Sequence, residues 1–248
     1  MNLAVFDLET NGYAGASVLS ASSIAFDEEG QIRGIFNRFY LPTEPFAPRL
    51  FSIHSLSPER LSALREGQCS PAYFVEDWPE LLDFWAKEDV NGIVVHNARF
   101  DWAFLPEVAQ AAFPCWCSMR GLTDLCALPP KNSSPGRYKP PRLSEAVDML
   151  CNGPLALSPT KELRRAEETV NELQAHVSLA DCFELYRLAV RVRLHHPDRM
   201  RFLPFSVPFR PPRKPPETFR TPLPQHDPFT EELRAFERTL LALSETVC

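Results

Sequence analysis

The sequence lacks the features that would place it in a membrane. No apolar run approaches the ~20 residues that a membrane span requires. The N-terminus, Met1-Asn2-Leu3, has no basic region followed by an apolar segment, which is the pattern of a secretory signal peptide. We therefore expect a cytoplasmic protein that does not contact a membrane.

Paired cysteines are also lacking. The seven cysteines are odd in number, scattered, and without CxxC spacing, which fits a reducing compartment. Cys115 and Cys117 lie close in sequence, but no second pair completes a zinc site. We expect buried, reduced thiols.

An excess of positive charge is missing as well. The chain has 26 Lys and Arg against 32 Asp and Glu, which gives a net charge of −6. This balance argues against non-specific coating of nucleic acid, although it permits a basic rim around an acidic site. The hydrophobic fraction of 44% and the length of 248 residues are those of a globular protein with a sizeable core.

Glycine is scarce, whereas proline is abundant. None of the nine glycines follows Gly153, and ten of the 25 prolines follow residue 196. A proline-rich segment without glycine is a stiff, extended spacer.

After this segment, Asp227-Pro228 is a good helix start, and apolar residues then recur at helical spacing. These residues are Phe229, Leu233, Phe236, Leu240 and Val247. We predict a main domain over 1–196 and an extension over 197–248 that ends in an amphipathic helix. The apolar stripe of this helix must pack on the main domain or on a protein partner.

The pattern before residue 197 is that of an α/β protein. Three segments joined by turn residues predict an antiparallel meander, and a short continuous apolar run predicts an inner strand. The predicted strands span residues 3–9, 17–27, 31–41 and 92–96. The predicted helices span residues 76–86, 98–112, 142–151, 160–175 and 178–194.

Two acidic residues interrupt the first apolar strand. The stretch VFDLET places Asp7 and Glu9 two residues apart. Side chains alternate across a strand, so both carboxylates point to the same face. Alone, such a pair is more often part of an exposed strand face.

Two further segments carry acids in apolar surroundings. Asn97 is a good N-cap, and Asp101 follows one turn into the predicted helix, near the carboxyl end of a strand, where open α/β sheets gather their sites. Asp181 interrupts the apolar face of another predicted helix, and His176 precedes it by five residues. Each of these residues alone has a structural explanation, but together they predict one site.

Four carboxylates around one point repel each other by roughly 3 kcal/mol per pair at about 5 Å and an effective dielectric of 20. Divalent cations relieve such repulsion, and oxygen ligands suit Mg²⁺ or Mn²⁺ rather than zinc. Two such ions can act on both the attacking and the leaving oxygen of a phosphodiester. A neutral histidine can accept the proton of the attacking water.

The three segments resemble the motifs of a known enzyme family. FDLET (6–10), HNARFD (96–101) and HVSLAD (176–181) resemble, in order, the motifs of the DEDDh family of 3′–5′ exonucleases. This family includes the proofreading subunits of bacterial DNA polymerases and exonuclease X. The resemblance covers about residues 3–190 and implies a ribonuclease H-like fold, with a central mixed sheet flanked by helices.

The resemblance also implies a role for each acidic residue. Asp7, Glu9, Asp101 and Asp181 would hold two Mg²⁺ or Mn²⁺ ions, and His176 would be the general base. Position 177 is Val, which excludes the version of the family with a tyrosine there.

The substrate-binding residues implied by the resemblance are Thr10, Tyr13, His54 and Asn97. The Tyr13 ring could stack on a base, or it could pack against the edge of the sheet.

Three segments depart from the family pattern or add positive charge. Residues 155–175 look like an inserted charged helix beside His176. Residues 131–142 and 199–220 combine basic and aromatic residues, which suits single-stranded nucleic acid. The alternative for 199–220 is a stiff tail strapped over the domain with its charges solvated.

Taken together, these features predict a metal-dependent 3′–5′ exonuclease that releases 5′-mononucleotides from single-stranded ends. We expect DNA as the substrate, although no motif distinguishes DNA from RNA. The alternatives are an exoribonuclease of the same family and a non-catalytic, nucleic-acid-binding accessory subunit of a polymerase complex. Loss of a ligand residue would mark the non-catalytic form, and none of the five residues is missing.

Overall fold

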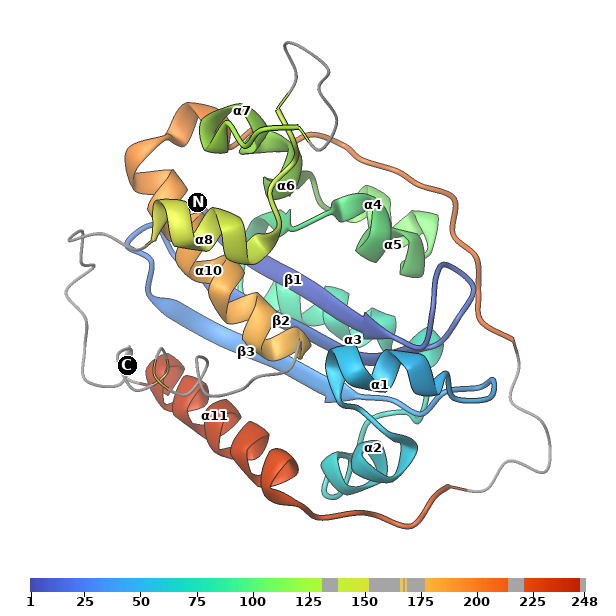
Figure 1. Ribbon diagram of the computed structural model, residues 1–248. Helices are drawn as coiled ribbons and strands as arrows, with labels where there is room; N and C mark the ends of the chain where they lie inside the picture. Colours follow the sequence, from blue (N-terminus) through green and yellow to red (C-terminus); the bar gives the residue numbers. More distant parts are fainter. Residues whose placement is uncertain (131–137, 152–165, 167, 169–176, 214–220, 246–248) are drawn as a thin grey trace.

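A five-stranded mixed sheet forms the centre of the computed structural model, which describes residues 1–130, 138–151, 166, 168, 177–213 and 221–245 (Figure 1). The strand order is β3-β2-β1-β4-β5. The strands are β1 (Asn2–Thr10), β2 (Val18–Phe26), β3 (Ile32–Phe39), β4 (Val90–Val95) and β5 (Cys115–Cys117). β1 pairs with β2, and β2 with β3, in antiparallel fashion, whereas β1 with β4 and β4 with β5 pair in parallel. The predicted meander and inner strand are confirmed, and the short β5 was not predicted.

The central strand β1 is covered on both faces because its apolar side chains alternate between two core layers. Leu3 and Val5 pack in the layer under α10 (Ser178–His195) and α8 (Leu143–Leu150). Phe6 packs in the other layer, where α3 (Phe74–Lys87) brings Trp85 edge-on to its ring at 5.5 Å. Figure 1 shows α8 and α10 in front of the sheet and α3 behind it. These three helices confirm three of the predicted ones.

The predicted helix over 98–112 is wrong as one continuous element. The chain forms α4 (Ala98–Asp101), a 3-10 turn η1 (Trp102–Phe104) and α5 (Glu107–Ala112). Leu105 is extended, with φ −99° and ψ 139°, because Pro106 follows it and disfavours the helical conformation in the preceding residue. Asp101 is therefore the last residue of a short helix.

Several short helices escaped the sequence analysis. They are α1 (Pro48–His54), α2 (Pro58–Leu64), α6 (Ser118–Gly121), α7 (Thr123–Cys126) and the 3-10 turn η2 (Pro197–Arg199). The start of α2 carries a recognisable signal, since the Ser57 side chain accepts a hydrogen bond from the Arg60 amide and Pro58 occupies the first turn. The predicted helix over 160–175 lies outside the described residues except for two positions.

The six described cysteines are all free thiols. Cys115, Cys126 and Cys182 are buried as expected, whereas Cys69 is exposed, so the expectation of burial is wrong there. Within the described ranges no helix combines the length and apolar character needed to cross a membrane.

The proline-rich segment lies against the main domain. Leu203 and Cys115 exchange backbone hydrogen bonds of 2.9 and 3.1 Å, so the tail pairs with the edge strand β5. Further along, the Gln110 side chain bonds both the N–H and the carbonyl of Val207, at 2.8 and 2.9 Å. For its described residues the tail is a strap, as the alternative for 199–220 proposed.

The terminal helix α11 (Pro228–Glu245) covers the opposite edge by packing along β3. Leu233, Phe236 and Leu240 are buried in the same core layer as α10, and the Phe236 ring meets Phe183 edge-on at 5.7 Å. The predicted stripe therefore packs on the main domain, with Val247 outside the described residues. The domain boundary at 196/197 stays a prediction.

Candidate metal centre

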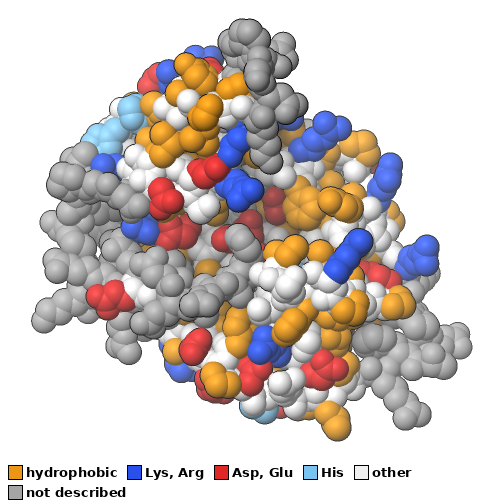
Figure 2. Space-filling model, viewed as in Figure 1, with side chains coloured by type: hydrophobic (Ala, Val, Ile, Leu, Met, Phe, Trp, Pro, Cys, Tyr) orange, Lys and Arg blue, Asp and Glu red, His pale blue; other side chains and the backbone are white. Residues whose placement is uncertain are grey.

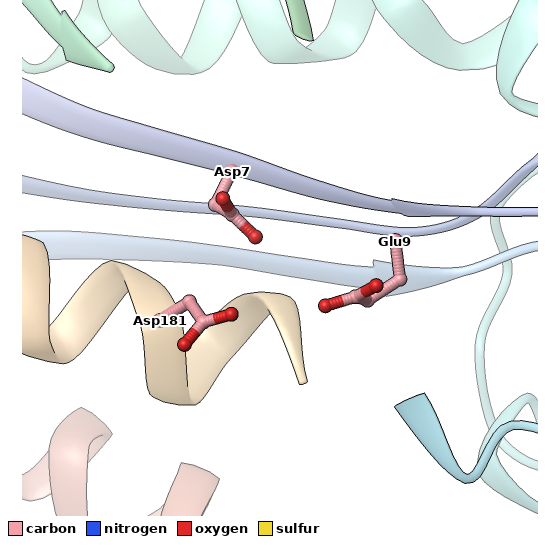
Figure 3. Close-up of side chains that lie close together, drawn as sticks. All are labelled: Asp7, Glu9 and Asp181. Atoms are coloured by element: carbon pink, nitrogen blue, oxygen red, sulfur yellow. The ribbon is translucent and has the colours of Figure 1, made fainter. Parts of the chain in front are cut away.

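The site begins near the C-terminal end of β1, where Asp7 and Glu9 are partly exposed. Asp7 and Glu9 continue the face that Leu3 and Val5 bury further back, and both point toward α10 (Figure 3). Both side chains keep part of their surface open to solvent. The prediction that the two carboxylates share one face is confirmed.

Asp181 comes from the first turn of α10 and faces the two β1 carboxylates. One carboxylate oxygen from each of Asp7, Glu9 and Asp181 lies within 4.8 Å of the other two. Oxygen ligands at this spacing suit a hard divalent cation such as Mg²⁺ or Mn²⁺.

A buried chain of hydroxyl groups fixes the start of α10 beside these acids. Ser20 and Ser22 on β2 are the cross-strand partners of Glu9 and Asp7. The Ser178 hydroxyl lies 2.8 Å from that of Ser20 and 2.7 Å from that of Ser22. Because Ser178 is the first residue of α10, these bonds set the position of Asp181 one turn later.

The same chain continues to the far edge of the sheet. The Ser22 hydroxyl donates its single proton to Asn37 Oδ1 at 2.8 Å, so it must accept the bond from Ser178. Ser178 has then used its own proton and accepts the bond from Ser20. Asn37 donates to Glu237 of α11 at 3.0 Å. Burial raises the pKa of Glu237, while the bond from Asn37 acts to lower it. The terminal helix is thus connected by hydrogen bonds to the start of the helix that carries Asp181.

Asp101 comes from α4, which follows β4, the neighbour of β1 on the side opposite to β2. It is 3% exposed, and its Oδ1 accepts a hydrogen bond of 3.2 Å from the Leu8 amide. The pairing of β4 with β1 ends at Val95 opposite Phe6, so no β4 residue is paired with Leu8. Asp101 is not among the three residues whose oxygens lie within 4.8 Å of one another, but its charge adds to the field at Asp7.

The pKa values show how unfavourable the bare cluster is. Burial raises the pKa of Asp7 well above its usual value, and Asp101, Asp181 and Glu9 raise it further. Burial likewise raises the pKa of Glu9, with additional contributions from Asp181 and Asp101. Burial also raises the pKa of Asp101, against two backbone hydrogen bonds and with Asp181 adding to the rise. A bound cation would reverse these effects by stabilising the ionised carboxylates.

His54 ends α1 and is 2% exposed. Its Nδ1 accepts from the Leu56 amide at 3.0 Å, which leaves the proton on Nε2. That Nε2 is buried and has no hydrogen-bond partner within the described part of the chain. Burial lowers the pKa of His54 to about 4, so the ring is a neutral donor at neutral pH.

Asn11 holds α1 near the end of β1. Its side chain donates to Glu44 and to the Pro45 carbonyl at 2.8 and 3.1 Å, and it accepts from the Ala47 amide at 2.8 Å. This role of Asn11 was not predicted. The signal for it is local, since an Asn directly after a strand is well placed to bond the backbone of a neighbouring loop.

The other predicted contacts are placed as follows. Tyr13 is 82% exposed, so it does not pack on the sheet edge. Thr10 is 7% exposed and donates to the Gly12 carbonyl at 2.7 Å. Asn97 is exposed and is the N-cap residue of α4 as predicted, with φ 62°, but its side chain makes no capping hydrogen bond. His176 lies outside the described residues.

His96 behaves as a structural histidine. Its Nε2 donates to the Pro141 carbonyl at 3.2 Å, and its Nδ1 lies 3.0 Å from the Ser118 hydroxyl. Burial lowers the pKa of His96 to about 4, although Pro141 and Asp181 act to raise it. The ring is neutral and fully bonded at neutral pH.

Acidic side chains gather near the middle of the face shown in Figure 2, with lysine and arginine side chains around them. This distribution fits a cation-binding centre with a positively charged surround. It also agrees with the basic rim that the net charge permits.

Comparisons with known proteins place this geometry in a wider context. No protein-family model and no curated protein sequence matches the chain. Among solved structures, the chain is similar to exonuclease X in complex with 5′ overhanging duplex DNA, with 17% identity, a TM-score of 0.51, and coverage of 80% of this chain and 96% of that one. The likeness shows a shared fold. The predicted ribonuclease H-like fold is thereby confirmed.

Two exonuclease I structures are similar to the same extent. One is from Methylocaldum szegediense, with 19% identity and a TM-score of 0.51. The match covers 80% of this chain and 41% of the M. szegediense chain. The other is from E. coli in complex with a dA16 oligonucleotide, with 16% identity and a TM-score of 0.51, and covers 80% and 42%. The chain thus matches less than half of the length of exonuclease I.

The raised pKa values predict how stability depends on pH. The pKa of Asp7 is higher in the folded protein than in the unfolded chain, so the folded protein binds the Asp7 proton more tightly. The free energy of unfolding therefore falls as the pH rises above the pKa of Asp7 in the unfolded chain. The loss is complete once the pH exceeds the pKa of Asp7 in the folded protein. Asp7→Asn should therefore stabilise the protein at pH 8 in EDTA and should have little effect near pH 3. Urea unfolding at both pH values measures this.

At a Mg²⁺ concentration a hundred times its Kd, Mg²⁺ should stabilise the wild-type protein by about 2.7 kcal/mol. It should stabilise the Asp7→Asn variant by less. The control is Asp83→Asn, at an exposed position of α3. A wild-type protein that is insensitive to Mg²⁺ and an Asp7→Asn variant without the pH-dependent gain would contradict a metal centre here.

The hydroxyl chain makes a second prediction. Ser178→Ala removes the shared partner of Ser20 and Ser22 and should cost about 1–3 kcal/mol of stability, because both buried hydroxyls lose a bond. It should also weaken the stabilisation by Mg²⁺, since Asp181 is no longer fixed. The control is Ser52→Ala, an exposed serine bonded within its own helix at 3.1 Å. Equal effects of the two substitutions would show that the chain does not position Asp181.

Proposed function

We propose that the protein is a metal-dependent 3′–5′ exonuclease that hydrolyses terminal phosphodiesters of single-stranded nucleic acid and releases 5′-mononucleotides. The observation that carries this proposal is the gathering of Asp7, Glu9 and Asp181 within 4.8 Å at the end of the central strand. The shared fold with exonuclease X and exonuclease I supports it. The order of the three sequence motifs supports it further.

The donor set fits Mg²⁺ or Mn²⁺. Asp7, Glu9 and Asp181 offer carboxylate oxygens only, and the raised pKa values of Asp7 and Glu9 give a cation a strong electrostatic reason to bind. Asp101 is the fourth proposed ligand, at present bonded to the Leu8 amide. When bound, two ions would supply positive charge to both the attacking and the leaving oxygen of the phosphodiester.

His176 is the proposed general base that removes the proton from the attacking water. This role rests on the HVSLAD motif, because His176 lies outside the described residues. Ser178, two residues later, is the point at which the chain is anchored to β2.

Several side chains are available for the terminal nucleotides. The exposed Tyr13 ring lies shortly after the end of β1 at Thr10 and could stack on a base, a contact typically worth ~1–3 kcal/mol. The exposed Phe51 and Ile53 of α1 add apolar surface in the same region, which Asn11 ties to β1. The neutral His54 would donate from Nε2 to a phosphate or sugar oxygen. Thr10 and Asn97 complete the proposed set.

We expect DNA as the substrate, because the exonuclease X and exonuclease I structures hold duplex DNA with an overhang and a deoxyadenosine oligonucleotide. An exoribonuclease remains the alternative within the same chemistry. A non-catalytic accessory subunit is the alternative outside it, but retention of all four carboxylates and His176 favours catalysis. Roles in DNA repair or proofreading follow only if DNA is the substrate.

The test is the release of nucleotides from 3′-labelled and 5′-labelled single strands of DNA and RNA with equal sequence. With Mg²⁺ or Mn²⁺, the 3′ label should leave first as a mononucleotide, and the 5′ label should give a shortening ladder. EDTA should abolish the reaction, and Asp7→Ala should reduce its rate by at least a hundredfold, whereas Asp83→Asn should leave it unchanged. Cleavage that survives Asp7→Ala, or no cleavage of either strand, would overturn the proposal.

A further inference from the structure

A cavity lies at the β5 edge of the sheet, two strands away from the β1 carboxylates. Its volume is about 660 Å³, within the range of small-molecule sites. Two segments far apart in sequence form its walls, namely β5 with α6 and residues 198–205 of the strap. The paired hydrogen bonds between Cys115 and Leu203 hold these walls together. The cavity therefore depends on the strap.

Positive charge converges on this cavity. Arg120 reaches it from α6, and Arg199 and Arg201 reach it from the strap. Among the described residues that line it, Asp198 is the one acidic residue, at 3.6 Å from Arg199 Nε. Arg120 and Arg201 form no ion pair with any residue that the structure describes. Three arginines with one acid stand out in a chain with a net charge of −6.

An apolar wall stands beside these charges. Leu203 is 62% exposed, Pro204 is exposed and Phe205 is partly buried. The buried Trp116 forms part of the lining. Exposed apolar side chains next to guanidinium groups are suited to a ligand that has both a flat apolar part and an anionic part.

We propose that this cavity binds a phosphate ester, either a phosphate group of a nucleic-acid strand or that of a free nucleotide. Arginine binds phosphate through two parallel N–H donors, and three arginines supply more donors than one phosphate group can accept. The sugar or base of the same ligand contacts Leu203 and Phe205. The strand as the source rests on the proposed function, whereas the free nucleotide does not.

The site contains its own reporter. Cys117 lines the cavity and is partly exposed, whereas Cys69 is exposed elsewhere. A ligand in the cavity should slow alkylation of the Cys117 thiol by a maleimide and leave Cys69 unaffected. Mass spectrometry of the full-length chain follows both thiols in one sample.

The experiment uses the Asp7→Ala variant in EDTA, so that neither turnover nor metal binding intervenes. The probes are deoxyadenosine monophosphate, deoxyadenosine and a twelve-nucleotide oligodeoxynucleotide. The phosphate esters should protect Cys117, and deoxyadenosine should not. The double change Arg199→Glu and Arg201→Glu should weaken binding of the protecting probe at least tenfold. Arg33→Glu, at an exposed position of β3, is the matched control and should leave binding unchanged.

The two sources give different patterns. Protection by the mononucleotide identifies a nucleotide site, and protection by the oligonucleotide alone identifies a strand-binding site. Arg120→Glu, on a separate wall, provides an independent variant if the double variant fails to fold. The proposal is overturned if no phosphate ester protects Cys117, if deoxyadenosine protects it equally, or if Arg33→Glu weakens binding as much as the cavity variants. Loss of nuclease activity alone bears on the carboxylate site and not on this cavity.

Discussion

Carboxylate oxygens from Asp7, Glu9 and Asp181 lie within 4.8 Å of one another, and the repulsion among them is the interaction that the surrounding structure must withstand. Two charges about 5 Å apart repel by roughly 3 kcal/mol at an effective dielectric of 20. Burial adds to this cost, as the raised pKa values of Asp7 and Glu9 show. Such a cluster destabilises the fold when no cation is bound and stabilises it when one is bound.

The elements around the cluster hold it in place. β1 aims Asp7 and Glu9 by strand alternation, and two serines on β2 fix the start of α10 through Ser178. The Leu8 amide, which has no partner on β4, holds Asp101 beside them. The strap and α11 cover the two edges of the sheet, and Glu237 joins α11 to the same hydrogen-bonded chain. Rigidity at the cluster thus depends on residues from both ends of the chain.

The parts that could be predicted from the sequence are those set by local rules. The shared face of Asp7 and Glu9 follows from a period of two, and the stripe of α11 follows from helical spacing. The predicted helix over 98–112 is wrong because Pro106 disfavours the helical conformation at Leu105. The hydroxyl chain could not be predicted, because Ser178 meets β2 only through a long-range register. The cavity at β5 likewise arises from a pairing between residues 115 and 203.

If these carboxylates form a divalent-cation centre, anomalous diffraction from crystals soaked in Mn²⁺ should locate the ion between them. We expect an anomalous peak beside carboxylate oxygens of Asp7, Glu9 and Asp181, at a distance close to the roughly 2.0–2.1 Å typical of Mg²⁺. The same soak of Asp7→Asn crystals should give weaker density at this position or none. Well-ordered Mn²⁺ elsewhere in the crystal, with no density between these three residues, would show that they do not form a divalent-cation centre.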